Sequence, residues 1–357
     1  MPPDISPPDA ATLAARADLD RLWARGSAFL GCRVALLGGA MSWVSERHLV
    51  SAISNAGGFG VIACGSMNPD QLAAEIAGTQ ALTSQPFGVN LITMHPQLDD
   101  LVRVCLEAKV GHIVLAGGIP PGSAVRAVKN GGARLIAFTP ALVLAKRLVR
   151  SGVDALVIEG SEAGGHIGPV STSVLAQEIL PVVSGDIPVF VAGGIARGEA
   201  ILAYLEMGAS GAQLGTRFAA AVESIAHPKF KQAFIRANAR DALPSVQLDE
   251  RFPVIPVRGL VNEGTKRFLR HQAETRDRFL AGTLNKEAAQ LEIEHFWAGA
   301  LRRAVIDGDV ENGSVMVGQS VGMVTAEQSV ADIIEELVDQ AVAALVARNR
   351  TVSPGSA

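Results

Sequence analysis

The chain of 357 residues is 48% hydrophobic, enough for one large core or two smaller ones, and its 31 basic and 35 acidic residues form no basic block that would bind nucleic acid. Cys32, Cys64 and Cys105 fit no metal-binding spacing and indicate a reducing compartment, and no apolar run reaches about 18 residues. We therefore expect a cytoplasmic protein with no metal site, no membrane span and no nucleic-acid partner.

The N-terminal region is expected to be a loose tail followed by a helix. Its first residues are rich in proline, whereas Ala11–Arg25 has apolar residues at helical spacing, among them Leu13 and Leu19. We assign residues 1–28 to this tail and lead-in helix.

A repeating unit follows, in which a short aliphatic or β-branched run precedes an Ala- and Leu-rich helical stretch. The eight runs are Val34–Ala40, Gly58–Cys64, Pro86–Ile92, His112–Ile119, Ala133–Thr139, Asp154–Gly160, Ile187–Ile195 and Gly211–Arg217. They are continuous rather than alternating, as strands buried on both faces of a parallel sheet require. Eight such units favour a (β/α)8 TIM barrel over an open doubly wound sheet.

The pattern breaks after Phe218. Helical spacing returns at Phe230–Ala239, Leu291–Ile306 and Ala326–Ala347, and Phe252–Gly282 is rich in Arg, Glu and Gln without a run typical of a strand. We expect residues 29–235 and 300–350 to form the barrel, and residues 236–299 to form a mostly helical appendage over its mouth. The last helical stretch is expected to pack back as the outermost helix.

Glycines end the last two predicted strands. Gly193-Gly194 and Gly215-Thr216 would expose backbone N–H groups at two neighbouring helix N-termini, where a phosphate would bind. The alternative is that each pair only forms a tight turn. Two pairs on the strands that commonly form the phosphate site of such barrels favour phosphate binding.

The sharpest single feature is the glycine-rich loop around His166. Gly164, Gly165 and Gly168 would let the backbone approach a flat ligand while the imidazole enters the site. His166 could act as a base, donate a hydrogen bond to an oxyanion or supply a proton. The flanking carboxylates Glu159 and Glu162 are more typical of hydrogen-bond acceptors that order a loop.

Other strand ends leave their roles open. Asn90 could bind the edge of a ligand ring or tie down a loop, and Met41 and Trp43 could wall a pocket or pack in the core. The late segment Gly313–Gly322 is expected to be a turn between helices, and its glycines around Gln319 would let it fold over the barrel mouth.

These motifs together resemble the nitronate monooxygenase (2-nitropropane dioxygenase-like) family of FMN barrels. The resemblance covers about residues 29 to 325, and its six motifs occur in the family's order: Gly39-Ala40-Met41-Ser42-Trp43, Asn55-Ala56-Gly57-Gly58-Phe59-Gly60, Pro86-Phe87-Gly88-Val89-Asn90, Glu162-Ala163-Gly164-Gly165-His166-Ile167-Gly168, Ala192-Gly193-Gly194-Ile195 and Gly215-Thr216-Arg217-Phe218. Met41-x-Trp43, Glu223-Ser224 before His227-Pro228, and the segment from Gly313 to Gln319 look especially like the enoyl-ACP reductase II branch.

The resemblance implies an FMN site at the strand ends. The phosphate would lie at Gly193, Gly194, Gly215 and Thr216, the ring near Met41, Asn90, Gly164 and Gln319, and catalytic His166 on the substrate side. The residues that we expect to bind FMN are Ala40, Met41, Asn90, Glu159, Gly164, Gly165, Gly193, Gly194, Gly215, Thr216 and Gln319.

The resemblance further implies a flavin-dependent oxidoreductase of a small-molecule or acyl-type substrate. Oxidation of alkyl nitronates by oxygen through FMN is the first expectation. The alternatives are an NADH-dependent flavin reductase of enoyl-ACP or quinones, and a barrel that binds a phosphorylated metabolite without flavin. NAD(P)H is a candidate electron donor, and a homodimer is a candidate assembly. The only tyrosine, Tyr204, lies on a predicted barrel helix, whereas the best-described bacterial monooxygenases carry tyrosines in a late motif.

Overall fold

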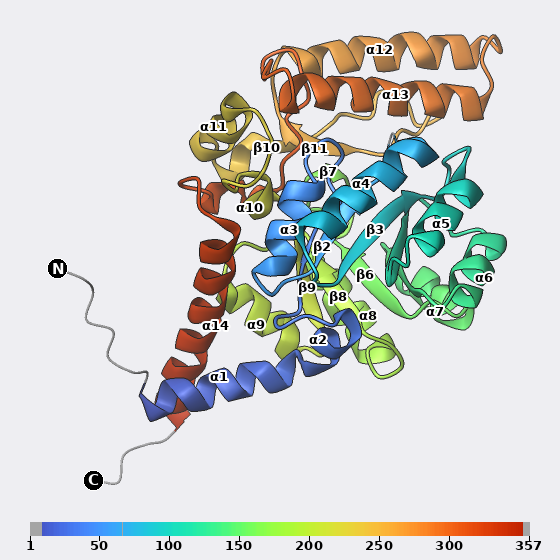
Figure 1. Ribbon diagram of the computed structural model, residues 1–357. Coiled ribbons are helices and arrows are strands. Elements are labelled where there is room, and N and C mark those ends of the chain that lie inside the picture. The colour runs from blue at the N-terminus through green and yellow to red at the C-terminus, as the bar shows by residue number, and fades with distance from the viewer. Residues whose placement is uncertain (1–8, 66, 353–357) are drawn as a thin grey trace.

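A closed ring of eight parallel strands forms the centre of the molecule. The computed structural model describes residues 9–65 and 67–352, so the expected tail up to residue 8 lies outside the described residues. The strands are β1 Leu36–Gly38, β2 Gly60–Ala63, β3 Phe87–Ile92, β4 His112–Ala116, β5 Arg134–Thr139, β6 Ala155–Glu159, β8 Val189–Ala192 and β9 Gly211–Leu214 (Figure 1). They are hydrogen bonded in the order β1-β9-β8-β6-β5-β4-β3-β2, and a parallel bridge between Leu37 and Phe59 closes the ring. Each strand lies within a predicted run, and the expected TIM barrel is confirmed.

Helices cover the outside of this barrel because its strands are apolar on both faces. Val157 and Ile158 of β6, for example, are both fully buried. The covering helices are α3 Arg47–Asn55, α4 Pro69–Leu82, α5 Leu98–Glu107, α6 Gly122–Asn130, α7 Leu142–Arg150, α8 Thr172–Val183, α9 Gly198–Glu206 and α14 Val330–Val352. Local signals set several helix starts: Asn68 and Gln71 form a reciprocal capping box at the start of α4.

The last helix, α14, packs back on the barrel as the sequence predicts. A Cβ at Gly198, the first residue of α9, would overlap the carbonyl oxygen of Leu337 on α14. Gln340 Oε1 accepts a hydrogen bond of 2.8 Å from the Gly198 N–H. The N-terminus of α9 is therefore covered by α14 and capped by its side chain.

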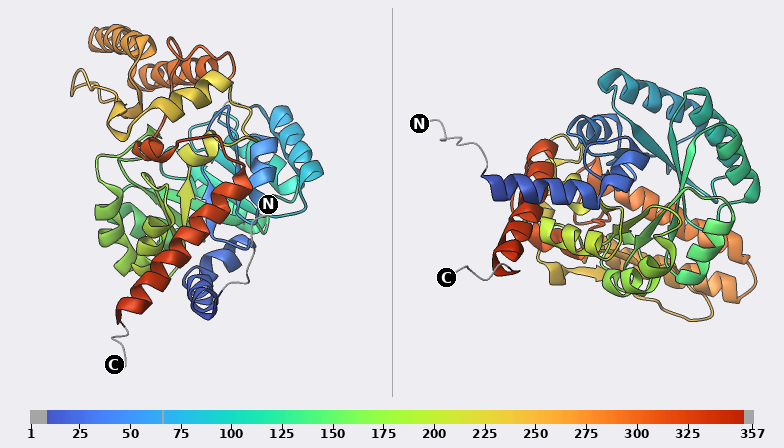
Figure 2. Two further views of the ribbon diagram at one scale, coloured as in Figure 1. Left: turned by 90° about the vertical axis from the view of Figure 1, so that its left-hand side faces the viewer. Right: turned by 90° about the horizontal axis from the view of Figure 1, so that it is seen from below.

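Two N-terminal helices lie at the opposite end of the barrel from the appendage (Figure 2). The single helix expected over Ala11–Arg25 is in fact two, α1 Ala10–Leu22 and α2 Ala24–Leu30. The carbonyl oxygen of Phe29 lies 2.9 Å from Nε2 of His112, which begins β4. The His112 ring also meets the rings of Phe29 and Phe59 edge-on, so this imidazole joins α2 to the barrel floor.

The chain between β9 and α14 holds the mostly helical appendage over the other end of the barrel. The short α10 Thr216–Ala219 directly follows β9, and α11 Pro228–Arg236 leads into the appendage, whose helices are η1 Ala239–Asp241, α12 Glu263–Leu280 and α13 Lys286–Val305; η2 Gln319–Met323 follows α13. The helices α12 and α13 lie side by side as a hairpin above the strand ends (Figures 1 and 2). The sequence predicts that the barrel begins again at residue 300. The helix α13 continues across this position without a break.

The expectation that Phe252–Gly282 holds no strand is wrong. Strand β11, Val257–Leu260, lies within it and pairs antiparallel with both β10, Ala242–Pro244, and β7, Gly165–His166. Strands of two to four residues are too short for an alternating pattern to be recognised in the sequence. The resulting small sheet joins the His166 segment to the appendage.

No helix in residues 9–65 and 67–352 combines the length and the apolar character needed to cross a membrane.

We predict that His112 makes the fold sensitive to mild acid. Burial is the main reason that the pKa of His112 falls from 6.5 to about 4. The unfolded chain therefore binds this proton more readily, so the stabilisation is complete above pH 6.5 and is lost as the pH falls toward 4. In urea unfolding across this interval, His112→Gln should lose less free energy of unfolding than the wild type, by up to about 3 kcal/mol.

The exposed His48, replaced by glutamine, is the control and should follow the wild type. Identical losses in wild type and His112→Gln would contradict this role of the buried imidazole.

Candidate functional site

The predicted site residues converge on the end of the barrel that faces the appendage, because parallel strands all end on one side. On the adjacent strands β8 and β9, Ala192 pairs with Gln213, so the turns that follow these strands are neighbours. Gly193 and Gly194 have φ values of +100° and +72°, a left-handed conformation that favours glycine. Each is partly exposed, as is Gly215.

Free backbone donors gather at these two turns. In the part of the chain that the structure describes, no hydrogen bond is donated by the N–H of Gly193, Gly194, Gly215 or Thr216. A Cβ at Gly215 would contact only Met41 Sδ, at 3.5 Å, so the space beside this turn is open. Several unpaired N–H groups beside an open space suit an anionic group such as a phosphate.

One of the two helix N-termini expected beside these turns is already capped by the protein. The sequence predicts two helix N-termini at this place, but the first amide of α9, at Gly198, is bonded to Gln340. The donors that remain free belong to the Gly193-Gly194 turn and to the turn that begins the short α10. No local pattern signals this cap, because Gln340 lies 142 residues further along the chain.

Asn90 carries a buried polar atom that needs a partner. Its side chain is 5% exposed on β3, and Oδ1 has no hydrogen-bond partner within the described residues. A buried amide oxygen of this kind is rare unless a ligand or water meets it. This orphaned acceptor fits a ring with N–H groups, such as the isoalloxazine of a flavin.

A second amide at the mouth was missed by the sequence analysis. Gln213 is 9% exposed on β9, and its Nε2 lies 3.6 Å from where a Cβ on Gly39 would stand. The signal available was a polar side chain near the end of an otherwise apolar strand.

The loop after β1 is held in place by a buried serine. Ser45 Oγ donates to the Gly39 carbonyl oxygen at 2.8 Å and accepts from the Met41 N–H at 3.0 Å. Ala40 and Met41, both predicted to bind the cofactor, are partly exposed on this loop. Met41 thereby lies beside the open Gly215 turn.

Trp43 connects the same loop to the appendage. Its φ of +67° is strained for a residue with a bulky side chain. Its indole Nε1–H donates to the Ala298 carbonyl oxygen of α13 at 3.2 Å, and the Arg302 guanidinium lies 5.8 Å from the ring centre. The sequence does not decide whether Trp43 walls a pocket or packs in the core. In the structure, Trp43 lies between the barrel mouth and α13.

His166 lies on strand β7 rather than in an irregular loop, which corrects the expectation from the glycines around it. Its partner in the ladder is Val257 of β11. The side chain is 40% exposed, and Nε2 lies 3.2 Å from Oε1 of Glu294 on α13. Glu294 was also missed, since a glutamate on an appendage helix carries no local sign of a role.

The glycines before His166 also serve the backbone packing. A Cβ at Gly164 would lie 2.6 Å from the Gly318 nitrogen, closer than real Cβ atoms approach. Gly165 has a φ of +77°. Gly164 is nevertheless exposed to solvent. Its lack of a side chain therefore permits the contact with Gly318 and leaves its backbone accessible.

Two carboxylates behave differently in this loop. Glu162 Oε2 accepts hydrogen bonds from the N–H and Oγ1 of Thr172, so this side chain orders the loop. Glu159 reaches the surface in part, but protein atoms surround its carboxyl group, and the loss of hydration raises its pKa to about 7. The nearby His166 acts in the opposite direction. Glu159 can therefore hold or release a proton near neutral pH.

The late glycine segment crosses the barrel mouth. The Gly318 N–H donates to Thr216 Oγ1 at 3.1 Å, and the Gln319 N–H donates to the Glu162 carbonyl oxygen at 2.9 Å. Met316 forms an antiparallel bridge with Gly259 of β11. Gln319 thus lies between the ends of β6 and β9, and the segment folds over the barrel mouth, the second of the two possibilities that the sequence offers.

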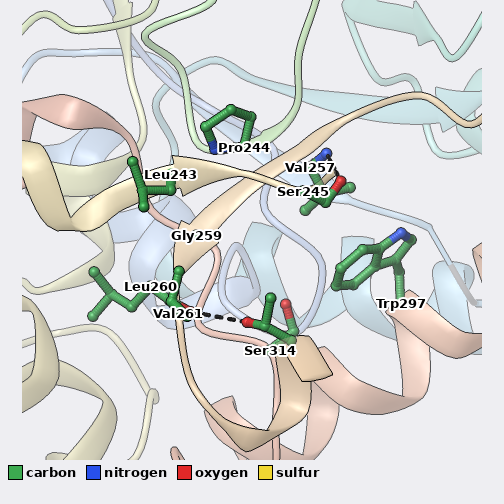
Figure 3. Close-up of a pocket in the computed structure, with 10 residues that line it drawn as sticks. Leu243, Pro244, Ser245, Val257, Gly259, Leu260, Val261, Trp297 and Ser314 are labelled. Atoms are coloured by element: carbon green, nitrogen blue, oxygen red, sulfur yellow. Dashed lines mark hydrogen bonds between the residues drawn. The ribbon is translucent and has the colours of Figure 1, made fainter. Parts of the chain in front are cut away.

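An apolar pocket lies in the appendage, along the β10 and β11 strands (Figure 3). Its lining residues are Leu243, Pro244, Ser245, Val257, Gly259, Leu260, Val261, Thr265, Trp297 and Ser314. They differ from every residue expected to bind the cofactor, so this pocket is not the candidate site.

Comparisons with known proteins show which proteins the chain resembles. A family model described as nitronate monooxygenase matches residues 25–104 and 98–340. A Mycobacterium tuberculosis protein, (3aS,4S,5R,7aS)-5-hydroxy-7a-methyl-1-oxo-octahydro-1H-indene-4-carboxyl-CoA dehydrogenase, is 30% identical over 330 residues, which are 85% of this chain and 91% of that protein.

Two solved structures are similar along almost their whole length. FabK from Thermotoga maritima is 35% identical with a TM-score of 0.79, covering 92% of this chain and 99% of its own. A nitroalkane oxidase from Streptomyces ansochromogenes is 26% identical with a TM-score of 0.70, covering 90% and 98%.

We predict that Asn90→Leu separates ligand binding from stability. The change removes a buried acceptor that has no protein partner, so the ligand-free protein should melt at the same or a higher temperature. The loss of one hydrogen bond to a flavin, worth about 1 kcal/mol, should weaken FMN binding about fivefold. Fluorescence titration of the ligand-free protein with FMN measures the affinity.

Thr275→Val on α12 is the matched control, because Thr275 Oγ1 is also buried without a partner within residues 9–65 and 67–352. It should leave FMN affinity unchanged. An Asn90→Leu variant that binds FMN as tightly as the wild type would remove Asn90 from the site.

Proposed function

The chain belongs to the nitronate monooxygenase family, and on that premise we propose that it is an FMN-dependent oxidoreductase acting on an acyl thioester. The family consists of flavin-dependent oxidoreductases, and its model matches most of the chain. FMN as the particular flavin and the thioester as substrate class are the two steps that go beyond the family. Sequence alone favours nitronate oxidation first; we place the thioester first because a relative at 30% identity is named a dehydrogenase of a carboxyl-CoA compound.

The observation that carries the FMN proposal is the group of free amides at Gly193, Gly194, Gly215 and Thr216. These donors would hold the phosphate, and the orphaned oxygen of Asn90 would meet the ring. When bound, FMN would supply hydride transfer, which no side chain of the chain provides. A barrel that binds a phosphorylated metabolite without flavin is the less economical alternative, because it leaves the family match unexplained.

The chain's own residues would manage protons and water. The His166 imidazole, held at Nε2 by Glu294, leaves Nδ1 to take a proton from, or return it to, a substrate carbon beside a carbonyl group. Below about pH 7 the Glu159 carboxyl is neutral and can donate a hydrogen bond. The Met316–Gln319 backbone across the mouth would keep water from the reacting atoms.

The substrate class rests on the relatives. The Mycobacterium tuberculosis relative is named a dehydrogenase of a carboxyl-CoA compound, which is an acyl thioester. Its identity to this chain exceeds the 27% of the relatives named probable nitronate monooxygenase. Nitronate oxidation remains the second candidate, favoured by the family model and by the nitroalkane oxidase structure.

Anaerobic stopped-flow spectroscopy of the flavin tests this proposal. We expect the purified protein to be yellow, NADH or a saturated acyl-CoA to bleach the flavin band, and an enoyl-CoA to restore it. An alkyl nitronate should bleach it more slowly. A flavin that only the nitronate reduces would favour the second candidate, and a colourless protein that ignores FMN would overturn the proposal.

We predict that His166→Ala keeps its flavin but slows turnover. Removing a proton-transfer group costs about 100-fold or more in rate. The flavin content per chain and the rate of the bleaching step are the two measurements. His48→Ala, an exposed histidine on α3, is the control. Undiminished turnover in His166→Ala would exclude this imidazole from the reaction.

A further inference from the structure

We propose that Glu294 is a positioning residue that fixes the tautomer and the orientation of His166. This inference rests on the proposed function, in which His166 handles the substrate proton. It assigns a role in the site to α13, a helix of the appendage that carries none of the predicted site residues.

The contact itself is direct. Glu294 Oε1 lies 3.2 Å from His166 Nε2, within the range of a hydrogen bond between an imidazole and a carboxylate. The carboxylate accepts the Nε2–H, so the proton of the neutral ring is held on Nε2 and the lone pair is left on Nδ1. A carboxylate that orients an imidazole in this way also restricts ring rotation.

The geometry of α13 makes Glu294 a rigid partner. Residues Glu294, Ala298 and Arg302 are spaced four apart and share one face of the helix. Ala298 accepts the Trp43 indole hydrogen bond, and the Arg302 guanidinium lies over the Trp43 ring. The same helical face therefore contacts the barrel mouth at the β7 strand and at the loop after β1.

Hydrophobic packing holds both ends of this helix. Ile293 and Trp297 are buried in the smaller apolar cluster of the appendage. Leu301 and Val305 belong to the main core of the barrel. Since α13 packs into both clusters, the position of Glu294 relative to His166 is fixed.

Stability does not explain the pair. The His166 and Glu294 side chains are 40% and 37% exposed, and ion pairs this exposed contribute at most about 1 kcal/mol. Glu159, at the end of β6, also interacts electrostatically with His166. The opposite neighbour on β11 is the apolar Val257. Glu294 is thus the carboxylate that engages Nε2 from the appendage side.

Kinetics of matched variants test the positioning role. We expect Glu294→Ala to lower kcat about tenfold, the lower end of what losing an imidazole-orienting carboxylate costs, with KM and melting temperature unchanged. Glu294→Gln should recover most of the rate, because its amide oxygen still accepts the Nε2–H. Glu292→Gln is the control: Glu292 lies on the same helix but pairs with Arg278 of α12.

A double variant identifies His166 as the group through which Glu294 acts. In a His166→Ala background, Glu294→Ala should slow the reaction no further. An equal additional loss in that background, or a Glu294→Ala enzyme as fast as the wild type, would overturn the proposal.

The tautomer of His166 can be measured without turnover, so a failure of this inference can be told apart from a failure of the proposed function. Nitrogen NMR of isotope-labelled histidine, with and without FMN, should report the Nε2–H tautomer for His166 in the wild type and in Glu292→Gln. Glu294→Ala should give a mixture of tautomers. A pure Nε2–H tautomer in Glu294→Ala would contradict the positioning role, even if the protein is found to act on a thioester. The expected mixture of tautomers would support the positioning role, even if the substrate belongs to another class.

Discussion

The close approach of two glycines, Gly164 and Gly318, is the constraint on which the arrangement of the mouth depends. A Cβ at Gly164 would lie 2.6 Å from the Gly318 nitrogen, and a Cβ at Gly318 would lie 2.8 Å from the Glu162 carbonyl oxygen. No residue with a side chain fits at either position without moving a backbone. Because the two segments touch, the Gln319 N–H reaches the Glu162 carbonyl oxygen, and the late chain is fixed across the end of β6.

This contact makes the site a joint product of the barrel and the appendage. The barrel supplies the free amides and Asn90, whereas the appendage supplies Glu294 and the β11 strand that straightens the His166 segment. The appendage has its own apolar cluster, in which the Phe268 and Trp297 ring centres lie 4.0 Å apart. Each large apolar side chain buried there contributes about 2 kcal/mol, which is enough to hold α13 in place over the mouth.

Sequence predicted the parts of the molecule that have a local signal. The strand β6 was found because residues 155–158 form a continuous apolar run, and Asn90 stood out as an amide within such a run. The cap of Gly198 by Gln340 and the pairing of His166 with Glu294 join residues more than a hundred positions apart. Nothing near either partner in the chain signals these contacts, and β11 is too short to show a period.

The exposure of His166 bears on the choice between the two substrate classes. An acyl thioester keeps an acidic C–H beside its carbonyl group, which an imidazole can deprotonate, whereas an alkyl nitronate has already lost that proton and would meet the imidazole only as a hydrogen-bond donor. An acyl thioester carries a large group that must remain outside while its carbonyl end enters. His166 and Glu294, each more than one-third exposed, lie at the accessible edge of the mouth, where such a carrier can stay in solvent. The position of the histidine is thus compatible with the thioester that we propose.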